Sequence, residues 1–265
     1  MGKGKYERRH KSMIAHYIIT SSSYSKGTRI AHDYAIETEK TTQEVTDYLK
    51  DRVKKIYNEC GIDVSVSTHL IHTGDKSWES VSNYDGFFKG VEEIKDLDEF
   101  ISTINKDREL KGTDIAKYIL TKKECTHLKL QKLVYFCYAE YLTTHDKLFE
   151  DTIYAFRYGP VVESVYEKYK FFGSEKIANE DNEQNICIKS SLELPARSRI
   201  TFAKNGLSKW YVVDEVLKKY GDLTAGELVN LTHKKNTPWY VSPKEENYSE
   251  ISDENILKYH KNETI

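Results

Sequence analysis

Two histidines, His69 and His72, have the spacing that would let a helix present both to one metal ion. The residues around this pair alternate between polar and apolar types, however, and such alternation indicates a strand. Side chains three positions apart on a strand point to opposite faces of the sheet. We therefore expect no metal site at these histidines.

Other catalytic motifs are also missing from the sequence. The serines from Ser21 to Ser25 lie outside any Gly-x-Ser-x-Gly elbow, and no motif designates a partner base. The acidic stretch from Asp75 to Asp85 lacks EF-hand spacing, and no glycine-rich phosphate loop occurs. We expect no catalytic residue, no metal and no cofactor, and hence a protein that is not an enzyme. The alternative, an enzyme in the N-terminal part, would require perturbed titratable groups gathered in a cleft.

The cysteines and the apolar segments indicate a cytoplasmic protein. Four cysteines without Cys-x-x-Cys spacing favour free thiols in a reducing compartment. No apolar run is long enough for a transmembrane helix, and residues 13–19 are too short and too interrupted for a signal peptide. We expect no membrane partner. The cysteines are Cys60, Cys125, Cys137 and Cys187.

Charge is nearly balanced over the whole chain but not at its start. The 40 Lys and Arg residues face 42 Asp and Glu residues, a balance that argues against a general nucleic-acid binder. Residues 1–30 nevertheless carry seven basic residues and one acid, a local charge of +6. This segment predicts a solvated arm, with contact to nucleic-acid phosphates as the alternative.

The first half of the chain predicts a small α/β domain in which one helix covers a sheet. Alternation indicates the strands, and a Thr-x-x-Glu capping box begins the helix, whose apolar residues recur at spacings of four and three. The expected elements are strands at 16–20, 28–38 and 62–67, a polar loop at 21–27, a helix from Thr41 and Glu44 to Gly61, and a helix at 97–104.

The second half predicts a mainly helical domain, separated from the first at the charged stretch 106–112. Residues 1–110 and 111–265 are thus the expected domains. Thr126 is a good N-cap for the strongest helix, which has an apolar stripe from Leu130 to Tyr141 and would point Lys129 and Lys132 to solvent. Further expectations are a helix at 114–120, a polar acidic loop at 174–191, a helix from Ser208 to Tyr220 capped by Gly221, and a capped helix from Thr224 and Glu227 to Thr232.

Four segments of this second half, in order, resemble the Panacea (SocA-like) antitoxin family over residues ~113–240. The helix His127–Cys137 resembles the family's "LKLQKLLYF", and Ala155–Val162 resembles its "AWRYGPV" strand and turn, with Phe156 in place of Trp. Tyr166, with the tail through Gly173, is the third segment. Leu228–Trp239 resembles the "LSH…PW" ending. The first 110 residues have no counterpart in short family members.

The resemblance implies an antitoxin that neutralises a cognate protein toxin by direct binding, or that acts as a protease adaptor and presents the toxin for degradation. A phage or prophage protein that binds a host or defence protein is an alternative, as is an autoregulatory DNA-binding protein that uses the basic arm. A small toxic gene beside this one would be the most informative observation.

The residues most distinctive of the family are also the candidate partner-binding or scaffold residues. Arginine and aromatic side chains are common interface anchors, whereas Gly and Pro shape turns. We expect a sharp strand-to-helix turn at Gly159-Pro160, and a helix-terminating turn at Pro238-Trp239 whose Trp docks on the bundle. The candidates, expected in one region, are Arg157, Tyr158, Gly159, Pro160, His233 and Trp239. The overall fold predicted is α+β.

Overall fold

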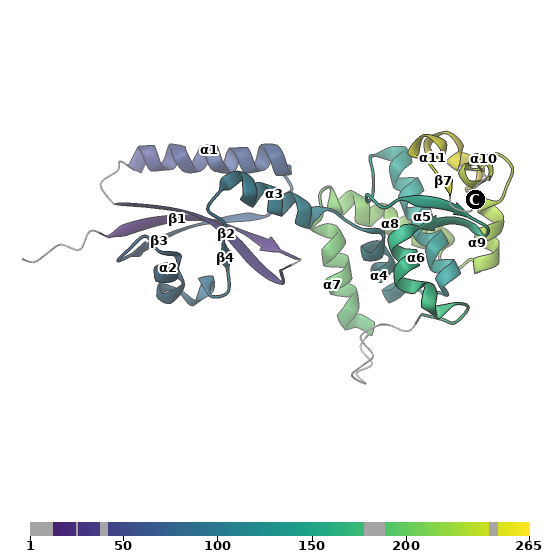
Figure 1. Cartoon of the computed structure of the whole chain (residues 1–265), viewed down its shortest axis with the longest axis horizontal. Helices are drawn as coiled ribbons and strands as arrows, with labels where there is room; N and C mark the ends of the chain where they lie inside the picture. Colours follow the sequence, from purple (N-terminus) through teal and green to yellow (C-terminus); the bar gives the residue numbers. More distant parts are fainter. Residues whose placement is uncertain (1–12, 25, 38–41, 178–188, 244–248) are drawn as a thin grey trace, which may run out of the picture. The chain divides into compact units, whose positions relative to one another are not determined.

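The computed structural model describes residues 13–24, 26–37, 42–177, 189–243 and 249–265. The chain is α+β, as the sequence predicts, and it divides into two compact units, Met1–Arg108 and Glu109–Ile265 (Figure 1). The predicted capping box at Thr41, Cys187 and most of the predicted acidic loop lie outside the described residues.

The N-terminal unit is built on a four-stranded sheet with the order β3-β1-β2-β4. β1 pairs antiparallel with both β2 and β3, whereas β4 runs parallel to β2. The elements are β1 (Ile14–Ser23), β2 (Thr28–Glu37), α1 (Thr42–Cys60), β3 (Val66–Thr73), α2 (Trp78–Tyr84), the 3₁₀ turn η1 (Gly86–Phe88), β4 (Glu92–Glu93) and α3 (Leu97–Arg108).

Both faces of this sheet are covered, whereas the sequence predicts a single covering helix. Figure 1 shows α1 and α3 on one side of the sheet and α2 on the other. Ile19 packs with Ile56 and Phe100, while its neighbour Ile18 packs with Val81 and other residues of the opposite layer. Successive side chains of a strand point to opposite faces, so the apolar run in β1 is that of a central strand buried on both sides.

The third strand begins later than predicted. Residues 62–65 form no strand, because Gly61 adopts a positive φ of 92° to end α1 and the Val64 N–H donates to the Gly61 carbonyl in a turn. Val64 is buried from this turn, and Ile62 is 92% exposed. The alternation of polar and apolar residues over 62–67 therefore reflects a turn in which only Val64 is buried, followed by the first residues of β3. His69 and His72 do lie on a strand, as predicted.

The C-terminal unit consists of helices around α5, with a small sheet of order β6-β5-β7. Its elements are α4 (Gly112–Lys122), α5 (His127–Thr144), β5 (Ile153–Phe156), β6 (Gly159–Val162), α6 (Glu163–Tyr169), η2 (Lys170–Phe172), α7 (Lys189–Thr201), α8 (Gly206–Tyr220), α9 (Ala225–Thr232), α10 (Pro238–Val241), β7 (Ser249–Glu250), α11 (Asp253–Tyr259) and η3 (His260–Asn262).

Helix α5 lies at the centre of this unit. Thr126 caps it as predicted, since its side chain accepts a hydrogen bond from the Lys129 N–H. Every residue from Leu130 to Ala139 is buried, and the helix packs against α4, α8, α9 and α11. The predicted apolar stripe is thus confirmed as core. The capping box of Thr224 and Glu227 at the start of α9 is confirmed as well.

Candidate functional site

The segment Arg157–Pro160 forms the turn and second strand of a β-hairpin. β5 and β6 pair antiparallel with Phe156 opposite Gly159, so Arg157 and Tyr158 alone make the turn. The predicted strand-to-helix turn at Gly159-Pro160 is therefore wrong in place: a four-residue strand intervenes, and α6 begins only after Val162. Proline is tolerated in β6 because this is an edge strand of its sheet.

Gly159 allows the hairpin to lie directly against two helices. Its φ is +98°, and a Cβ at this position would lie 2.7 Å from Thr232 Oγ1 on α9 and 3.0 Å from Lys132 Cε on α5. Any side chain would therefore be strained by the backbone and would collide with its neighbours. The glycine of the family motif has a packing function here.

Two polar side chains of α5 form hydrogen bonds with backbone groups at the outer edge of β6. The Gln131 side chain accepts a hydrogen bond from the Val162 N–H (2.9 Å) and donates one to the Val162 carbonyl (3.4 Å). Lys132 Nζ donates to the Pro160 carbonyl at 2.7 Å. Side chains thus take the place of a neighbouring strand, which prevents buried backbone groups at this edge from remaining unpaired. The "LKLQKL" and "RYGPV" segments are joined by these bonds.

Lys132 is the largest error of the sequence analysis at this site. It was expected in solvent, yet its side chain is fully buried. Burial disfavours the ammonium form and lowers the pKa of Lys132 to about 7, while the nearby carboxylate of Glu263 partly opposes the shift. The amphipathic pattern failed because α5 is covered on nearly all sides, so a lysine on the face opposite the stripe still meets protein.

The last two candidates hold the hairpin from the other side. Trp239 Nε1 donates to the Phe156 carbonyl at 2.7 Å, and His233 Nε2 lies 3.2 Å from the Arg157 carbonyl. The two rings contact each other, with centroids 3.7 Å apart. The Trp thus docks on the hairpin, and Pro238 begins α10 after the Thr237 cap instead of terminating a helix.

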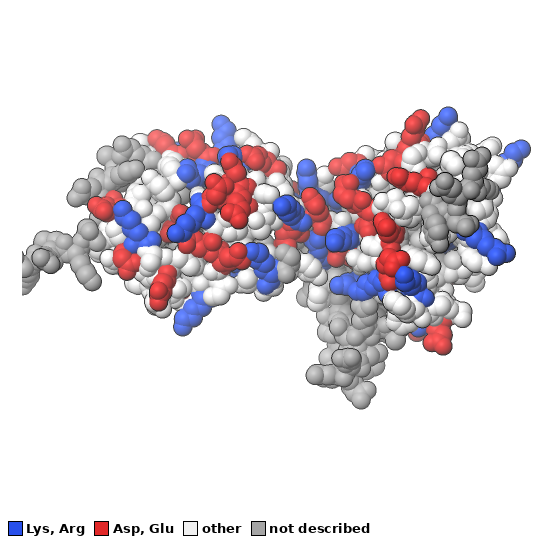
Figure 2. All heavy atoms as spheres, in the orientation of Figure 1, with Lys and Arg blue, Asp and Glu red and all other residues white. Residues whose placement is uncertain are grey.

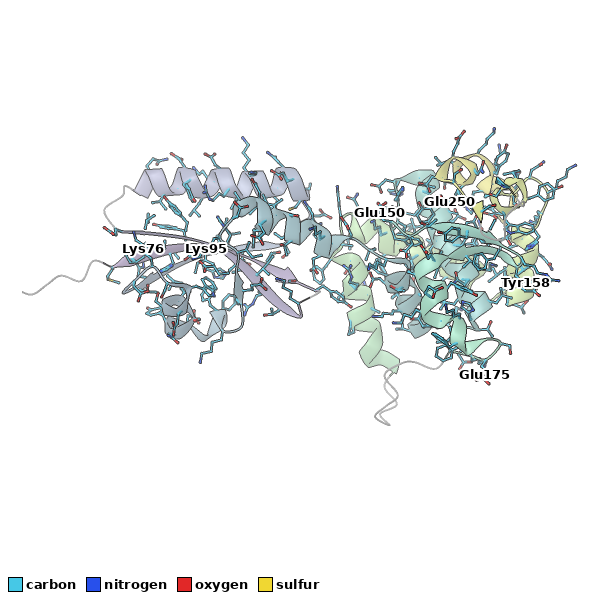
Figure 3. The ribbon with its side chains drawn as sticks, viewed as in Figure 1. Lys76, Lys95, Glu150, Tyr158, Glu175 and Glu250 are labelled. Carbon is cyan, nitrogen blue, oxygen red and sulfur yellow. The ribbon has the colours of Figure 1, made fainter. Side chains whose placement is uncertain are left out.

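All six candidate residues are therefore brought into one region, but with different exposures. Gly159 and Pro160 are buried, and His233 and Trp239 are half-buried beneath the turn. Arg157 and Tyr158 are exposed at its tip, where Figure 3 labels Tyr158. Only these two side chains are free to contact a partner extensively, and the other four fix their position.

A pocket of about 550 Å³ opens beside the hairpin. Residues from the start of α5, from the hairpin and from α6 line it. Sequence reasoning identified Arg157 and Tyr158 but missed the role of Gln131, although its place beside Lys132 in the family helix was a usable signal. The lining residues are Thr126, His127, Leu128, Gln131, Lys132, Phe156, Arg157, Tyr158, Val161, Tyr166, Gly173 and Ser174.

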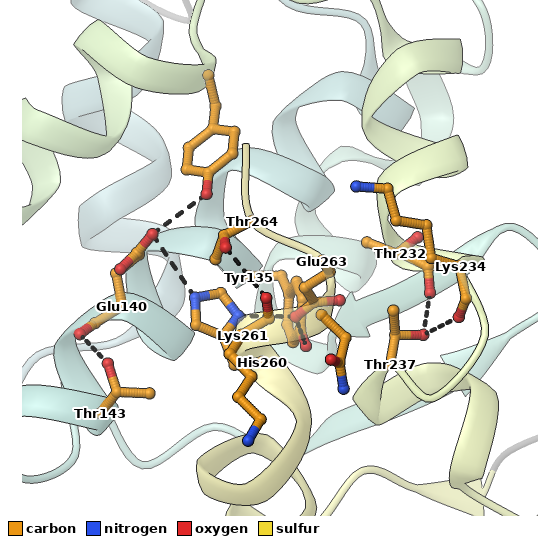
Figure 4. Close-up of polar contacts among 12 residues, drawn as sticks. Tyr135, Glu140, Thr143, Thr232, Lys234, Thr237, His260, Lys261, Glu263 and Thr264 are labelled. Carbon is orange, nitrogen blue, oxygen red and sulfur yellow. Dashed lines mark hydrogen bonds and ion pairs between the residues drawn. The ribbon is translucent and has the colours of Figure 1, made fainter.

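A buried polar network anchors the C-terminal segment to α5 (Figure 4). Tyr135 donates to Glu263 at 2.6 Å, and His260 Nδ1 lies 2.8 Å from the same carboxylate oxygen. His260 also faces Glu140 at 3.7 Å, and this carboxylate accepts from Tyr220. The adjacent His260 imidazole, together with the charge of Lys219 and the hydrogen bond from Tyr220, lowers the pKa of Glu140 to about 2.

The N-terminal unit contains one arrangement that resembles a nucleophile and its base. His16 Nδ1 lies 2.7 Å from Asp33 Oδ2, and His16 Nε2 lies 3.0 Å from Thr73 Oγ1. His16 is fully buried, however, and the Thr73 hydroxyl donates to the Asp75 carbonyl. The geometry is that of a structural network that ties three strands together. In the part of the chain that is described, no three His, Cys, Asp or Glu side chains gather in a way that could hold a metal.

The surface charge and the hydrophobicity of the helices bear on binding to nucleic acid and to membranes. On the face drawn in Figure 2, basic and acidic side chains lie among one another in both units. The predicted solvated arm of residues 1–30 is wrong over residues 14–23 and 28–30, which belong to β1 and β2 of the sheet. Of its seven basic residues, Lys26 pairs with Glu92, Arg29 lies over the Phe87 ring, and the remaining five lie outside the described residues. Among the described helices, none is both long and apolar enough to cross a membrane.

Comparison with known families adds the last observation. A family model described as "Antitoxin SocA-like, Panacea domain" matches residues 130–240. The matched range contains most of α5, the β5–β6 hairpin, α9 and Trp239, and it ends within α10. Comparisons with curated proteins and with solved structures gave no match. The resemblance of the second half is confirmed, and the N-terminal unit lies outside the match.

Proposed function

We propose that this chain, whose residues 130–240 form a SocA-like Panacea domain, is the antitoxin of a toxin–antitoxin system and neutralises a cognate protein toxin by binding it. The observation that carries the proposal is the hairpin tip. Arg157 and Tyr158 are exposed side by side, with the guanidinium 5.5 Å from the centre of the Tyr158 ring. Arginine and tyrosine are among the residues most often found as energetic anchors of protein interfaces.

The support beneath the tip strengthens this reading. The carbonyls of Phe156 and Arg157 are held by Trp239 and His233, and the Pro160 carbonyl is held by Lys132. A turn fixed in this way loses little conformational freedom when a partner binds, so more of the contact energy remains as affinity. In this proposal the residues of the family motif hold the backbone of the turn, so that Arg157 and Tyr158 are presented to the partner.

Neutralisation and binding with an Arg157→Ala variant test the proposal. The product of the neighbouring reading frame is the toxin to express, with cell growth as the readout of neutralisation. We expect toxin binding to weaken about 30-fold, or about 2 kcal/mol, with a nearly unchanged melting temperature. Arg197→Ala is the matched control, since Arg197, on α7, is also exposed but lies over Trp210 of α8, away from the hairpin. Equal binding by both variants would remove the hairpin tip from the interface.

Neutralisation by blocking and neutralisation by degradation give different toxin levels. A protease adaptor lowers the amount of toxin in the cell, and this loss disappears in a protease-deficient strain. A blocking antitoxin leaves the toxin level unchanged. Immunoblots of the toxin with and without this chain separate the two mechanisms.

The other two alternatives from the sequence have their own tests. A phage or prophage protein would bind a host or defence protein instead of a toxin, so a chain without effect on any neighbouring toxin would favour it. DNA binding by residues 1–30 would show a steep salt dependence, because each phosphate contact releases counterions. Replacement of Lys3, Lys5, Arg8, Arg9 and Lys11, which precede β1, with Gln would then abolish DNA binding and leave neutralisation intact.

A further inference from the structure

Cationic and aromatic side chains are prominent in the lining of the pocket beside the hairpin, and none of the described residues that line it is a carboxylate. Its lining includes Lys132 and Arg157 together with the rings of His127, Phe156 and Tyr166. The Phe156 and Tyr166 rings meet edge to face with centroids 5.2 Å apart, and the centroid of the His127 ring lies 5.4 Å from that of Tyr166. The pocket thus combines an apolar wall with positive charge.

Neither cation forms an ion pair among the described residues of the unit, although the Glu263 carboxylate lies close enough to Lys132 to compensate its charge in part. Arg157 makes no ion pair there, and its guanidinium has only the Tyr158 ring beside it. Lys132 donates to one carbonyl, although an ammonium group has three protons to donate. Burial of the ammonium group lowers the pKa of Lys132, and the Glu263 carboxylate opposes this shift only in part. An anion that enters the pocket would contact the exposed Arg157 guanidinium, and fully buried Lys132 would act on it only through its charge.

A second pocket of about 610 Å³ shares the aromatic wall but has the opposite character. Phe156, Val161 and Tyr166 line both pockets, whereas Glu163 and Glu167 line only the second. Lys170, the one cation in that second lining, already pairs with Glu167 at 2.5 Å. An acidic ligand would therefore be attracted to the pocket lined by Lys132 and Arg157 and repelled from the pocket lined by Glu163 and Glu167.

We propose that the pocket lined by Lys132 and Arg157 binds an acidic peptide segment of the protein partner, with a carboxylate on the Arg157 guanidinium and an adjacent apolar side chain against Phe156 and Tyr166. This inference rests on the proposed function, since it names the chemistry of the partner at the same hairpin. Arginine binds carboxylates through two parallel hydrogen bonds, which adds geometric selectivity to the attraction of charge. The apolar neighbour gains contact with a wall that is already formed.

Peptide libraries provide a test without knowledge of the toxin. The probe is a fluorescent hexapeptide library in which Phe or Leu lies beside Asp or Glu, and its matched library has Asn and Gln in place of the acids. Binding to the full chain is measured by anisotropy. We expect the acidic library to bind at least about tenfold more tightly, and Arg157→Ala to remove most of this preference. Glu163→Gln and Arg197→Ala should retain it, because neither residue lines the proposed pocket.

Two results would overturn the proposal. Equal binding of both libraries, or no binding of either, would show that the pocket does not select acidic segments. A preference for acids that survives in Arg157→Ala would place the anion elsewhere. Toxin neutralisation, measured with the same proteins, stays a separate readout: a chain that neutralises its toxin but ignores the acidic library retains the proposed function and loses only this inference.

Discussion

Both units bury polar side chains, but they use them in different ways. In the N-terminal unit His16 joins Asp33 and Thr73, so its hydrogen bonds connect strands and adjoining turns of one sheet. In the C-terminal unit Gln131 and Lys132 bind the backbone of a hairpin whose tip is exposed. The first arrangement stabilises a core, whereas the second also determines the shape of a surface. A buried polar group is therefore informative about function when the backbone it holds leads directly to exposed anchors.

The largest effect on this comparison is expected when the N-terminal unit is removed entirely. We propose that residues 109–265 fold alone, because the described residues of this unit form an apolar core of their own, from Leu110 to Ile256. The fragment should be soluble and should melt cooperatively, as followed by circular dichroism and calorimetry. The proposed partner surface should remain intact in it. A molten fragment would show that the units depend on each other for stability.

A change in the core should have the next largest effect. Leu133 is fully buried at the centre of α5, and Leu133→Ala should lower the free energy of unfolding by about 2–5 kcal/mol through lost burial and a cavity. Leu207→Ala is the matched control, because Leu207 is 72% exposed at the start of α8, and its effect should stay within about 0.5 kcal/mol. Chemical denaturation gives both values. Similar losses for the two variants would contradict the placement of the core.

Substitution of one glycine with positive φ in each unit compares how tightly the two backbones are packed. Gly159→Ala should cost about 2–4 kcal/mol, since the new Cβ adds a collision with Thr232 to the backbone strain. Gly27→Ala, at a turn of the N-terminal unit with φ +64° and nothing within 4 Å, should cost about 1 kcal/mol from strain alone. Equal costs would mean that the hairpin moves away from α5 and α9 without penalty.

The sequence predicted those features that local patterns determine. The caps at Thr126 and Thr224, the helix ended by Gly61 and the apolar stripe of α5 each depend on residues a few positions apart, and all were found. The six candidate residues were also expected together, and the structure brings them together, although no pattern showed that His233 and Trp239 would support the turn by hydrogen bonds.

The errors about burial and layers came from contacts between segments far apart in the chain, whereas the late start of β3 came from a local turn at Gly61–Val64. The burial of Lys132 depends on β6 and on the C-terminal segment, so helical periodicity alone could not predict it. The second covering layer of the N-terminal sheet comes from α2 and η1, which lie within residues 74–90, where Gly and Ser indicate only a loop. Tertiary contacts decide such positions, and a single sequence does not contain them in readable form.

The smallest expected effect concerns the network that ties the C-terminal segment to α5. The pKa of Glu140 is about 2 in the folded chain and near its ordinary value of 4.5 when unfolded. A carboxylate with a lowered pKa adds stability above its unfolded pKa, and this contribution is lost as the pH falls from about 4.5 towards 2. Glu140→Gln should therefore lower the free energy of unfolding by about 1 kcal/mol near neutral pH, a value reduced by the partial exposure of the carboxylate.

The pH dependence separates this electrostatic contribution from a packing defect. The difference between the wild type and Glu140→Gln should shrink as the pH falls below about 4.5, because the wild-type carboxylate then takes up a proton and resembles the amide. Glu150→Gln is the control, since the Glu150 side chain is 69% exposed and pairs only with Lys147 at 3.5 Å among the described residues (labelled in Figure 3). Urea denaturation at several pH values measures both variants. The loss of unfolding free energy in Glu140→Gln could instead stay constant at low pH. The network would then stabilise the C-terminal segment by packing and not by charge, and it would resemble the buried network around His16.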